Sequence, residues 1–306
     1  MSTEYDAFGP WVYEVSTGDE VPRLYRDHPV DLSASRLVLK VPRDIVRRDA
    51  TPDMDLYDHL LVAGAEGLTV LSRQPQGYST LQVPYDRITA IEHSVDLLDG
   101  KLTLHTSAAP VPVTVRYNGS SWAVMQALVR VLRDAYLPGV APAAVSLSDA
   151  PARTLHLAEL GERDVSLVTE QHAVHREEPS MALLAAHPSR IVTPVAGRGI
   201  AGGAARITHV AYPMTLQGAL LCTDGREALV IHRRLWWIRG RRRPVYSVAR
   251  TVIPVSRVDG LTTADHDRYA GVRTLSVRLG RTVLELPVPA GSDVETALPV
   301  ALGQAR

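Results

Sequence analysis

The stretch LLVAGAEGLTVLSR, residues 60–73, has a counterpart in LLCTDGREALVIHR, residues 220–233. The two align without a gap at an offset of 160 residues. Both are rich in aliphatic residues and carry glycine near the middle, which predicts strands joined by a turn. Similarity at a fixed offset inside one chain predicts that the same structural unit is built twice.

Further matches lie on either side of this pair. VPYDRI (83–88) and IPVSRV (253–258) share the order aliphatic, Pro, two variable residues, Arg, aliphatic, at an offset of 170. Ten residues have therefore been added to the second copy between the two matches. Upstream, SRLVLKVP (35–42) and SRIVTPVA (189–196) are interpreted as a third matching pair.

Downstream, each copy continues with apolar residues at every second position and then a helix signal. The alternation, KLTLHT and VTVRY in copy one and RTLSVRL and TVLELPV in copy two, is typical of half-buried antiparallel strands. In copy one, residues 120–139 begin with serine caps and end at Pro138-Gly139. An apolar stripe at helical spacing connects these ends: Val124, Met125, Leu128, Val131, Leu132 and Ala135. In copy two, Ser292 and Glu295 predict a capping box, and Pro299 is expected to weaken the helix or end it early.

Length and composition predict two domains. A chain of 306 residues fits two units of ordinary size. The stretch at 137–153 is rich in Ala, Pro and Ser and predicts a linker between an N-terminal domain, 1–136, and a C-terminal domain, 154–306. Residues 154–186 are interpreted as an extra strand pair or a short helix leading into copy two, and the first 30 residues are similarly ambiguous.

These patterns resemble tandem bacterial pleckstrin-homology-like (PH-like) domains. The resemblance is carried by HPSRIV, TDGREALVIHR, IPVSRVDGL, RTLSVRL and TVLELPV, each copy then closing with a capped helix, over about two thirds of the chain. It implies a mainly β (α+β) protein with two bent antiparallel sheets, or partial barrels, each closed by a C-terminal helix. It also implies a binding or assembly role. The chain departs from the pattern in its segment 233–252, in Pro299, and in lacking the transmembrane segments that often accompany such domains.

Several compositional features bear on location. The single cysteine, Cys222, excludes an intrachain disulfide. The N-terminus has no positively charged start followed by an apolar core, and no apolar run approaches the ~20 residues that span a bilayer. We therefore expect a cytoplasmic protein.

The ten added residues fall in HRRLWWIRGRRRPVY, residues 232–246. Residues 226–250 hold eight arginines and one glutamate, a charge of +7 in a chain whose net charge is zero. We expect a hairpin arm over 233–252, with strands near 228–238 and 244–253 that turn at residues 239–242. The candidate contact residues on this arm are Arg234, Trp236, Trp237, Arg239, Arg241, Arg242 and Arg243.

The arm has four interpretations. It is a solvated turn whose tryptophans lie beneath guanidinium groups, a protein or oligomer interface, a contact with an anionic membrane, or a nucleic-acid contact. We expect a protein partner or self-association ahead of a membrane. Nucleic acid comes last, because no second basic patch or recognition helix is visible.

A glycine loop matches a nucleotide-binding pattern weakly. Gly197, Gly199 and Gly202 satisfy G-x-G-x-x-G, and Asp224 follows about 20 residues later, as in dinucleotide sites. The segment that should form the phosphate-facing helix is short, β-branched and stopped by Pro213. We interpret the glycines as a flexible loop.

Potential metal ligands are incomplete sets. Asp53, Asp55, Asp58 and His59 lack the glycine turn and glutamate of a calcium loop. His172 and His175, three residues apart, would need further ligands. We expect no catalytic, metal or cofactor residue. The predicted function is non-catalytic binding, scaffolding or assembly; the alternatives are a peripheral binder of anionic membrane and, more distantly, a nucleotide-binding enzyme.

Overall fold

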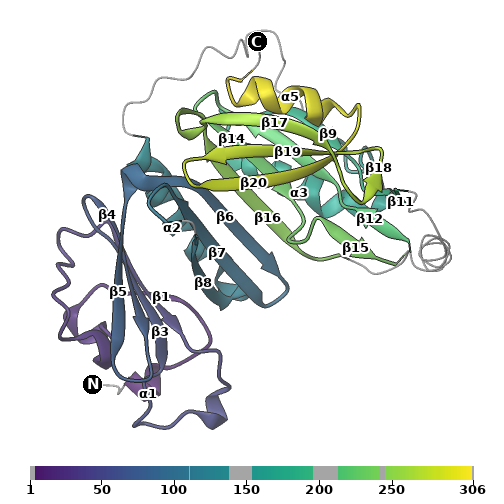
Figure 1. Ribbon diagram of the computed structural model, residues 1–306. Coiled ribbons are helices and arrows are strands. Elements are labelled where there is room, and N and C mark those ends of the chain that lie inside the picture. The colour runs from purple at the N-terminus through teal and green to yellow at the C-terminus, as the bar shows by residue number, and fades with distance from the viewer. Residues whose placement is uncertain (1–3, 110, 138–153, 196–212, 241–244, 305–306) are drawn as a thin grey trace. The chain divides into compact units, whose positions relative to one another are not determined.

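The computed structural model describes residues 4–109, 111–137, 154–195, 213–240 and 245–304. Over these ranges the protein is mainly β, with several antiparallel sheets, none of which closes into a barrel (Figure 1). The chain forms two compact units: residues 1–106 with 111–139, and residues 107–110 with 140–306. From residue 138 on, the linker predicted at 137–153 lies outside the described residues.

The first unit contains a five-stranded and a three-stranded sheet. The larger sheet has the order β1 (Tyr13–Glu14), β2 (Leu37–Pro42), β3 (Tyr57–Ala63), β4 (Gly67–Arg73), β5 (Tyr78–Pro84). The smaller consists of β6 (Ile88–Asp96), β7 (Asp99–Thr106) and β8 (Val113–Asn118). The helical elements are α1 (Glu4–Ala7), α2 (Trp122–Tyr136) and the 3-10 turns η1 (Gly18–Glu20), η2 (Arg23–Tyr25), η3 (Arg47–Asp49), η4 (Tyr85–Arg87) and η5 (Gly119–Ser121).

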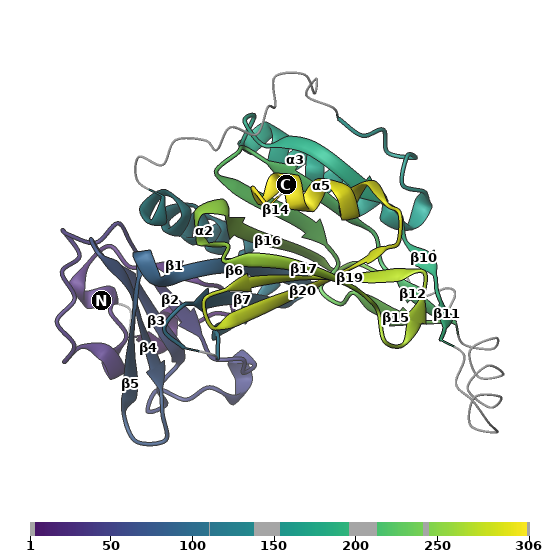
Figure 2. The same cartoon turned by 45° about the horizontal axis from the view of Figure 1, so that its top comes forward.

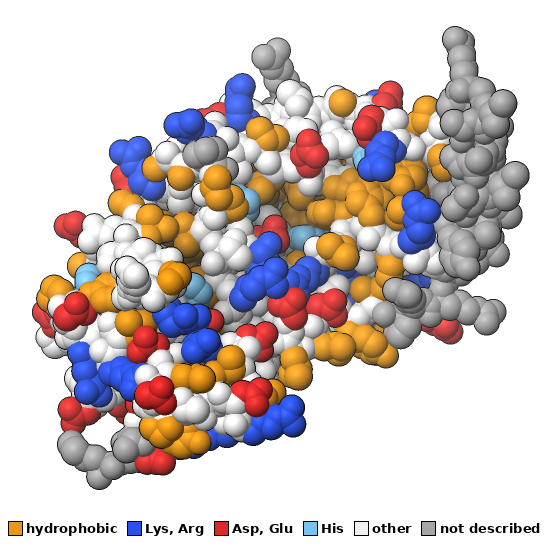
Figure 3. Space-filling view, turned by 60° about the horizontal axis from the view of Figure 1, so that its bottom comes forward, with side chains coloured by type: hydrophobic (Ala, Val, Ile, Leu, Met, Phe, Trp, Pro, Cys, Tyr) orange, Lys and Arg blue, Asp and Glu red, His pale blue; other side chains and the backbone are white. Residues whose placement is uncertain are grey.

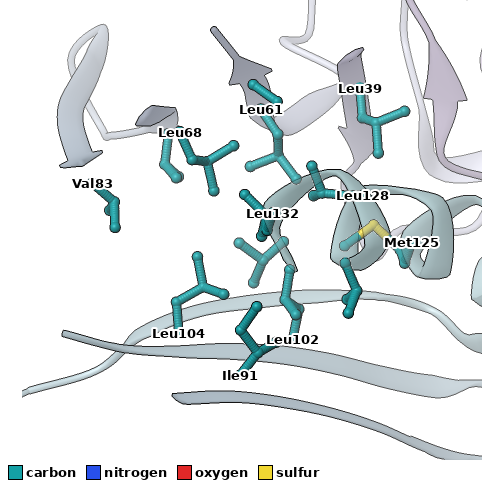
Figure 4. Close-up of a cluster of buried hydrophobic side chains, with 14 of the residues drawn as sticks. Leu39, Leu61, Leu68, Val83, Ile91, Leu102, Leu104, Met125, Leu128 and Leu132 are labelled. Atoms are coloured by element: carbon teal, nitrogen blue, oxygen red, sulfur yellow. The ribbon is translucent and has the colours of Figure 1, made fainter. Parts of the chain in front are cut away.

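Side chains of both sheets meet α2 in one core (Figure 4). The predicted helix is confirmed, and its stripe is apolar because it packs against strand residues such as Leu61 and Leu102. Met125, Leu128 and Leu132 are fully buried, each stabilising the fold by about 2 kcal/mol. The predicted serine cap is wrong. The Ser121 hydroxyl makes no capping bond and accepts a hydrogen bond from the Val12 N–H instead, at 2.9 Å.

The N-terminal segment covers the other face of the larger sheet. Phe8 and Tyr25 pack there with Leu60 and Leu71. Successive residues of a strand point to opposite faces, so Leu60 lies in this outer cluster while Leu61 lies in the inner core. Burial on both faces explains why β3 reads as an almost continuous apolar run.

The second unit has one four-stranded arrangement and one three-stranded sheet. The first has the order β16 (Val248–Pro254), β14 (Glu227–His232), β13 (Ala219–Thr223), β9 (Ala182–His187), and the second is β17 (Gly260–Asp265), β19 (Val272–Leu279), β20 (Thr282–Pro289). The short strands are β10 (Arg190–Ile191), β11 (Thr193–Pro194), β12 (Met214–Leu216), β15 (Trp237–Arg239) and β18 (Tyr269–Ala270). The helical elements are η7 (Glu162–Asp164), α3 (Val165–Glu177), η8 (Val255–Arg257) and α5 (Asp293–Ala301).

Helices cover this unit as well (Figure 2). Of the two alternatives for residues 154–186, the short helix is confirmed as α3. Leu167 and Val168 of α3 pack with Leu220 and Ile231 of β13 and β14, while α5 contacts β9 and β13.

Pairing in the two units follows the sequence offsets. Leu60 pairs with Leu71, and Leu220 pairs with Ile231, which is the same register at an offset of 160. In the next ladder Gly67 pairs with Pro84, and Glu227 with Pro254, the last at an offset of 170. Each ladder then runs into a 3-10 turn, η4 or η8.

The third predicted pair, 35–42 with 189–196, is wrong. β2 pairs with β3, but the strand that pairs with β13 is β9, ahead of residue 189. Residues 190–194 form β10 and β11, which pair with β12 and β18. The sequence of β9, ALLAAH, is rich in alanine, which has low strand propensity, and so carries no strand signal.

The predicted hairpin arm is also wrong. The ladder between β14 and β16 ends where His232 pairs with Ala249. Beyond it, β15 pairs with β12, Leu216 opposite Trp237. A free two-stranded arm is marginally stable in water, whereas pairing with β12 joins β15 to its own unit.

The predicted capping box at the last helix is not formed. Ser292 occupies the N-cap position, but its hydroxyl makes no capping bond. The Glu295 carboxylate accepts hydrogen bonds from the Gly291 N–H at 2.6 Å and the Arg273 Nε at 3.2 Å. The helix continues past Pro299 to Ala301.

Candidate interaction surface

The arm begins at a buried arginine. The Arg233 side chain is fully buried, and its two terminal nitrogens donate to the Ser166 hydroxyl (2.7 Å), the Ser247 carbonyl (2.9 Å) and the Arg163 carbonyl (2.7 Å). These bonds link the start of α3 to both sides of the arm. Sequence reasoning missed this residue, although its alignment with Arg73, which pairs with Asp58 at 2.8 Å, was a usable signal.

A buried acid accompanies Arg233. An Asp164 oxygen lies 3.8 Å from the guanidinium, and the same carboxylate accepts hydrogen bonds from the Ser189 N–H at 2.6 Å and hydroxyl at 2.9 Å. Burial lowers the pKa of Arg233, and Asp164 counteracts that shift. Because an arginine stays protonated in proteins, the pair fixes a positive charge inside the unit rather than on its surface.

Trp236 packs on a neutral histidine. The rings of His232 and Trp236 are stacked, with centroids 4.3 Å apart and planes 4° from parallel. The Nδ1–H of His232 donates to the Arg233 carbonyl at 2.7 Å, so Nε2 accepts from the Thr251 hydroxyl at 2.8 Å. Complete burial lowers the pKa of His232 to about 4, so the ring is neutral at pH 7.

Trp237 packs on the opposite side of the chain. Its ring lies 4.8 Å from that of Tyr269 and 4.9 Å from that of His266, in a cluster that includes Leu216. Both tryptophans are thus partly buried within their own unit, and neither is presented as a free ring.

The exposed apolar side chains of the arm are Leu235 and Tyr246, at 67% and 61% exposure. A hydrogen bond from the Arg234 N–H to the Ser247 hydroxyl (3.3 Å) places the two segments next to each other. The Gln217 side chain donates to the Leu235 carbonyl at 2.9 Å, which fastens this edge to the unit. We call the surface formed by Leu235, Tyr246, the partly exposed Arg234 and the exposed Arg239 the arm patch.

The arm exposes less positive charge than its sequence suggests. Among the arginines at 226–250, Arg226 pairs with Asp224 at 2.8 Å, Arg233 lies beside Asp164, and Arg250 binds Glu170 at 2.6 Å. Of the predicted contact residues, Arg241, Arg242 and Arg243 lie outside the described residues, as do the loop glycines Gly197, Gly199 and Gly202.

The acidic loop at 53–59 is occupied by protein partners. Asp55 pairs with Arg23 at 3.2 Å, Asp58 pairs with Arg73, and the Nδ1 of His59 lies 2.9 Å from the Ser72 hydroxyl. His172 is bonded to the Leu155 carbonyl at 2.8 Å. Over the ranges that the structure describes, no group of three or more His, Cys, Asp or Glu side chains is placed to hold a metal ion.

The first unit contains a cavity of about 690 Å³ between the ends of β2, β3, β7 and β8. Its wall carries Arg43 and Arg116 beside three aspartates, of which Asp58 is paired with Arg73 and Asp99 lies 3.6 Å from Arg116. The mixed, largely self-paired charges select no charged ligand, so the arm patch is the better-defined candidate site.

No family model matches the chain, and no curated protein or solved structure is significantly similar to it. None of the described helices is long and apolar enough to cross a membrane.

Proposed function

We propose that this chain is a non-catalytic binding, scaffolding or assembly protein built from two PH-like domains, and that it associates through the arm patch. The observation that carries the proposal is the exposure of Leu235 and Tyr246 side by side. Apolar side chains grouped on a surface mark interaction sites, whereas scattered ones do not. Here the bonds of Arg233 and Gln217 hold the patch in place.

The tandem arrangement is supported by the order of elements in each unit. Four strands in sequence-neighbour order, a 3-10 turn, three further strands and a helix recur, if the short strands β10 to β12, β15 and β18 are set aside. The faces correspond as well. Leu60 and Leu220 both lie beneath the segment that precedes the strands, the N-terminal residues in one unit and α3 in the other.

The charge distribution favours a protein over a membrane as the partner. Arginines near an anionic membrane surface contribute about 1 kcal/mol each, but three of the eight in this region lie beside acidic side chains of their own unit. On the face shown in Figure 3, basic and acidic side chains are interspersed. The partner we propose is therefore another protein surface, with a second copy of the chain as the first to test.

The test is the double variant Leu235→Ser with Tyr246→Ser. The concentration dependence of mass should be measured by sedimentation velocity up to ~1 mM, since small interfaces bind weakly. We expect the wild type to associate and the double variant to remain monomeric. Val283→Ser, which changes another exposed apolar side chain (53%), is the matched control and should behave as the wild type.

Vesicle binding separates the membrane alternative. Wild type should not co-sediment with vesicles containing anionic phosphatidylserine at low salt. A wild type that stays monomeric yet binds those vesicles, with binding lost as salt shortens the Debye length to ~8 Å, would replace the proposed function with the membrane alternative.

A further inference from the structure

Two leucines form the turn between β6 and β7. Leu97 and Leu98 are the only residues between Asp96 and Asp99, which pair with each other across the hairpin. Each leucine is 66% exposed. The hairpin therefore ends in an apolar tip with an acidic residue on each side, and we call residues 96–99 the acidic leucine tip.

Leu97 also has an unfavourable backbone conformation. Its φ is 54°, and it is the single non-glycine residue with positive φ in the described ranges. The two-residue turn between β19 and β20 has glycine, Gly280, at the corresponding first position, with φ 63°. A left-handed conformation is costly for residues with a Cβ, and short hairpin turns favour Asn or Gly. A leucine here is unfavourable for the turn and is not buried in its own unit, which is the kind of outlier that points to a role elsewhere.

The tip is held firmly. The Gly119 N–H donates to the Leu98 carbonyl at 2.7 Å. A Cβ atom at residue 119 would overlap the Leu97 carbonyl oxygen, so the glycine permits the close approach of η5 to the turn. Predicted from the sequence as a turn and helix cap, Asn118 is confirmed in that role: its side chain accepts from the Ser120 N–H at 3.1 Å. The two leucines are thus presented on a braced hairpin.

The charges around the tip indicate which surface it fits. Asp96 and Asp99 are exposed. Arg116 lies 3.6 Å from Asp99, but this pair is 70% and 50% exposed, and such surface pairs are weak. Two carboxylates beside the apolar pair disfavour an anionic membrane and favour an apolar surface with basic neighbours. The arm patch is such a surface, since Leu235 and Tyr246 lie among Arg234 and Arg239.

We propose that the acidic leucine tip of one copy docks on the arm patch of a second copy. This inference rests on the proposed function and identifies the partner surface. The two surfaces differ, so the contact is head-to-tail, and such contacts build rings or open chains rather than a closed two-fold dimer. The species should therefore grow beyond dimers as concentration rises.

The experiment uses two variants of the full chain. In the tip variant, Leu97→Asn with Leu98→Gly, the favoured Asn-Gly turn replaces the leucines, so the hairpin is kept while the apolar tip is removed. In the patch variant, Leu235 and Tyr246 become serine. Each variant alone should be monomeric where the wild type forms oligomers. Val111→Ser, at another exposed apolar residue of the first unit (72%), is the control for the tip and should associate as the wild type does.

An equimolar mixture of the two variants is the decisive measurement. Each mixed pair retains one intact tip and one intact patch, so the mixture should form 1:1 dimers and nothing larger. Dimers in the mixture support the proposal. A mixture that stays monomeric while the wild type associates would overturn it.

Other results separate this inference from the proposed function. If the patch variant is monomeric but the tip variant associates like the wild type, the tip is not the partner and the proposed function stands. If the wild type is monomeric, or if both variants associate as it does, both proposals fail. A tip variant that alters thermal stability in a chain that is always monomeric would indicate a contact within one chain and overturn the inference.

Discussion

Arg233 carries more of the local structure than its place in an arginine-rich sequence suggests. A buried charge is tolerated when hydrogen bonds replace its water shell. Here two carbonyls, one hydroxyl and the nearby Asp164 do so. The residue joins α3 to the arm and places Leu235, two residues further on, at the surface.

Replacing Arg233 should therefore be costly. We expect Arg233→Met to lower the free energy of unfolding by about 3–5 kcal/mol, because it leaves Asp164 without its cation and two carbonyls without donors. Urea denaturation measures this. Arg234→Met, at the next and partly exposed position, should change the free energy by less than about 1 kcal/mol. Equal losses in the two variants would show that burial of Arg233 contributes nothing special.

His232 makes stability depend on pH. Burial lowers its pKa from 6.5 in the unfolded chain to about 4 in the fold. The unfolded chain therefore binds a proton that the fold rejects as pH drops below 6.5, and the fold loses stability until about pH 4. A shift of this size corresponds to about 3 kcal/mol.

The variant His232→Gln isolates this contribution. His105 and His187 also have pKa values lowered to about 4 by burial, so the wild type loses stability through all three histidines. Free energies of unfolding at pH 7, 6 and 5 should fall less steeply in the variant. Parallel curves for variant and wild type would contradict the assignment.

At the level of elements, the β6–β7 turn shows a conflict between local preference and the residue present. Leucine is unfavourable at positive φ, whereas glycine is not. We expect Leu97→Gly to stabilise the protein by about 1 kcal/mol, which raises the melting temperature by about 2–4 °C in a domain of this size. Calorimetry of Leu97→Gly and Leu98→Gly makes the comparison, because Leu98 does not have positive φ and should gain nothing. A rise in both variants, or in neither, would mean that the Leu97 backbone is not strained.

The arm shows how an element changes its partner. Alternation along residues 235–238 correctly places Trp236 and Trp237 on opposite sides, one on His232 and one on Tyr269. It does not reveal that β15 pairs with β12 instead of continuing the β14–β16 hairpin. Either pairing satisfies the backbone hydrogen bonds of the strand, so tertiary packing decides between them.

At the level of the whole molecule, duplication and charge have different origins. The repeated registers of β3–β4 and β13–β14 follow from local apolar patterns that the sequence repeats. The net charge of zero combines a basic segment at 226–250 with acidic residues elsewhere, among them Asp96 and Asp99. A chain that carries both an acidic apolar tip and a basic apolar patch contains both halves of a head-to-tail contact.

The sequence by itself determined the mainly β class, the strands of the repeated stretch, the α2 stripe and the turn at Asn118, because each depends on periodicity or on bonds between near neighbours. Only the tertiary structure decided that β9 replaces 189–196 beside β13, that β15 pairs with β12, that Ser121 bonds to Val12 and that Arg233 is buried. Those outcomes depend on groups far apart in the chain. An apolar or polar pattern records that a side chain needs a partner, but the partner itself is chosen by how the strands and helices pack.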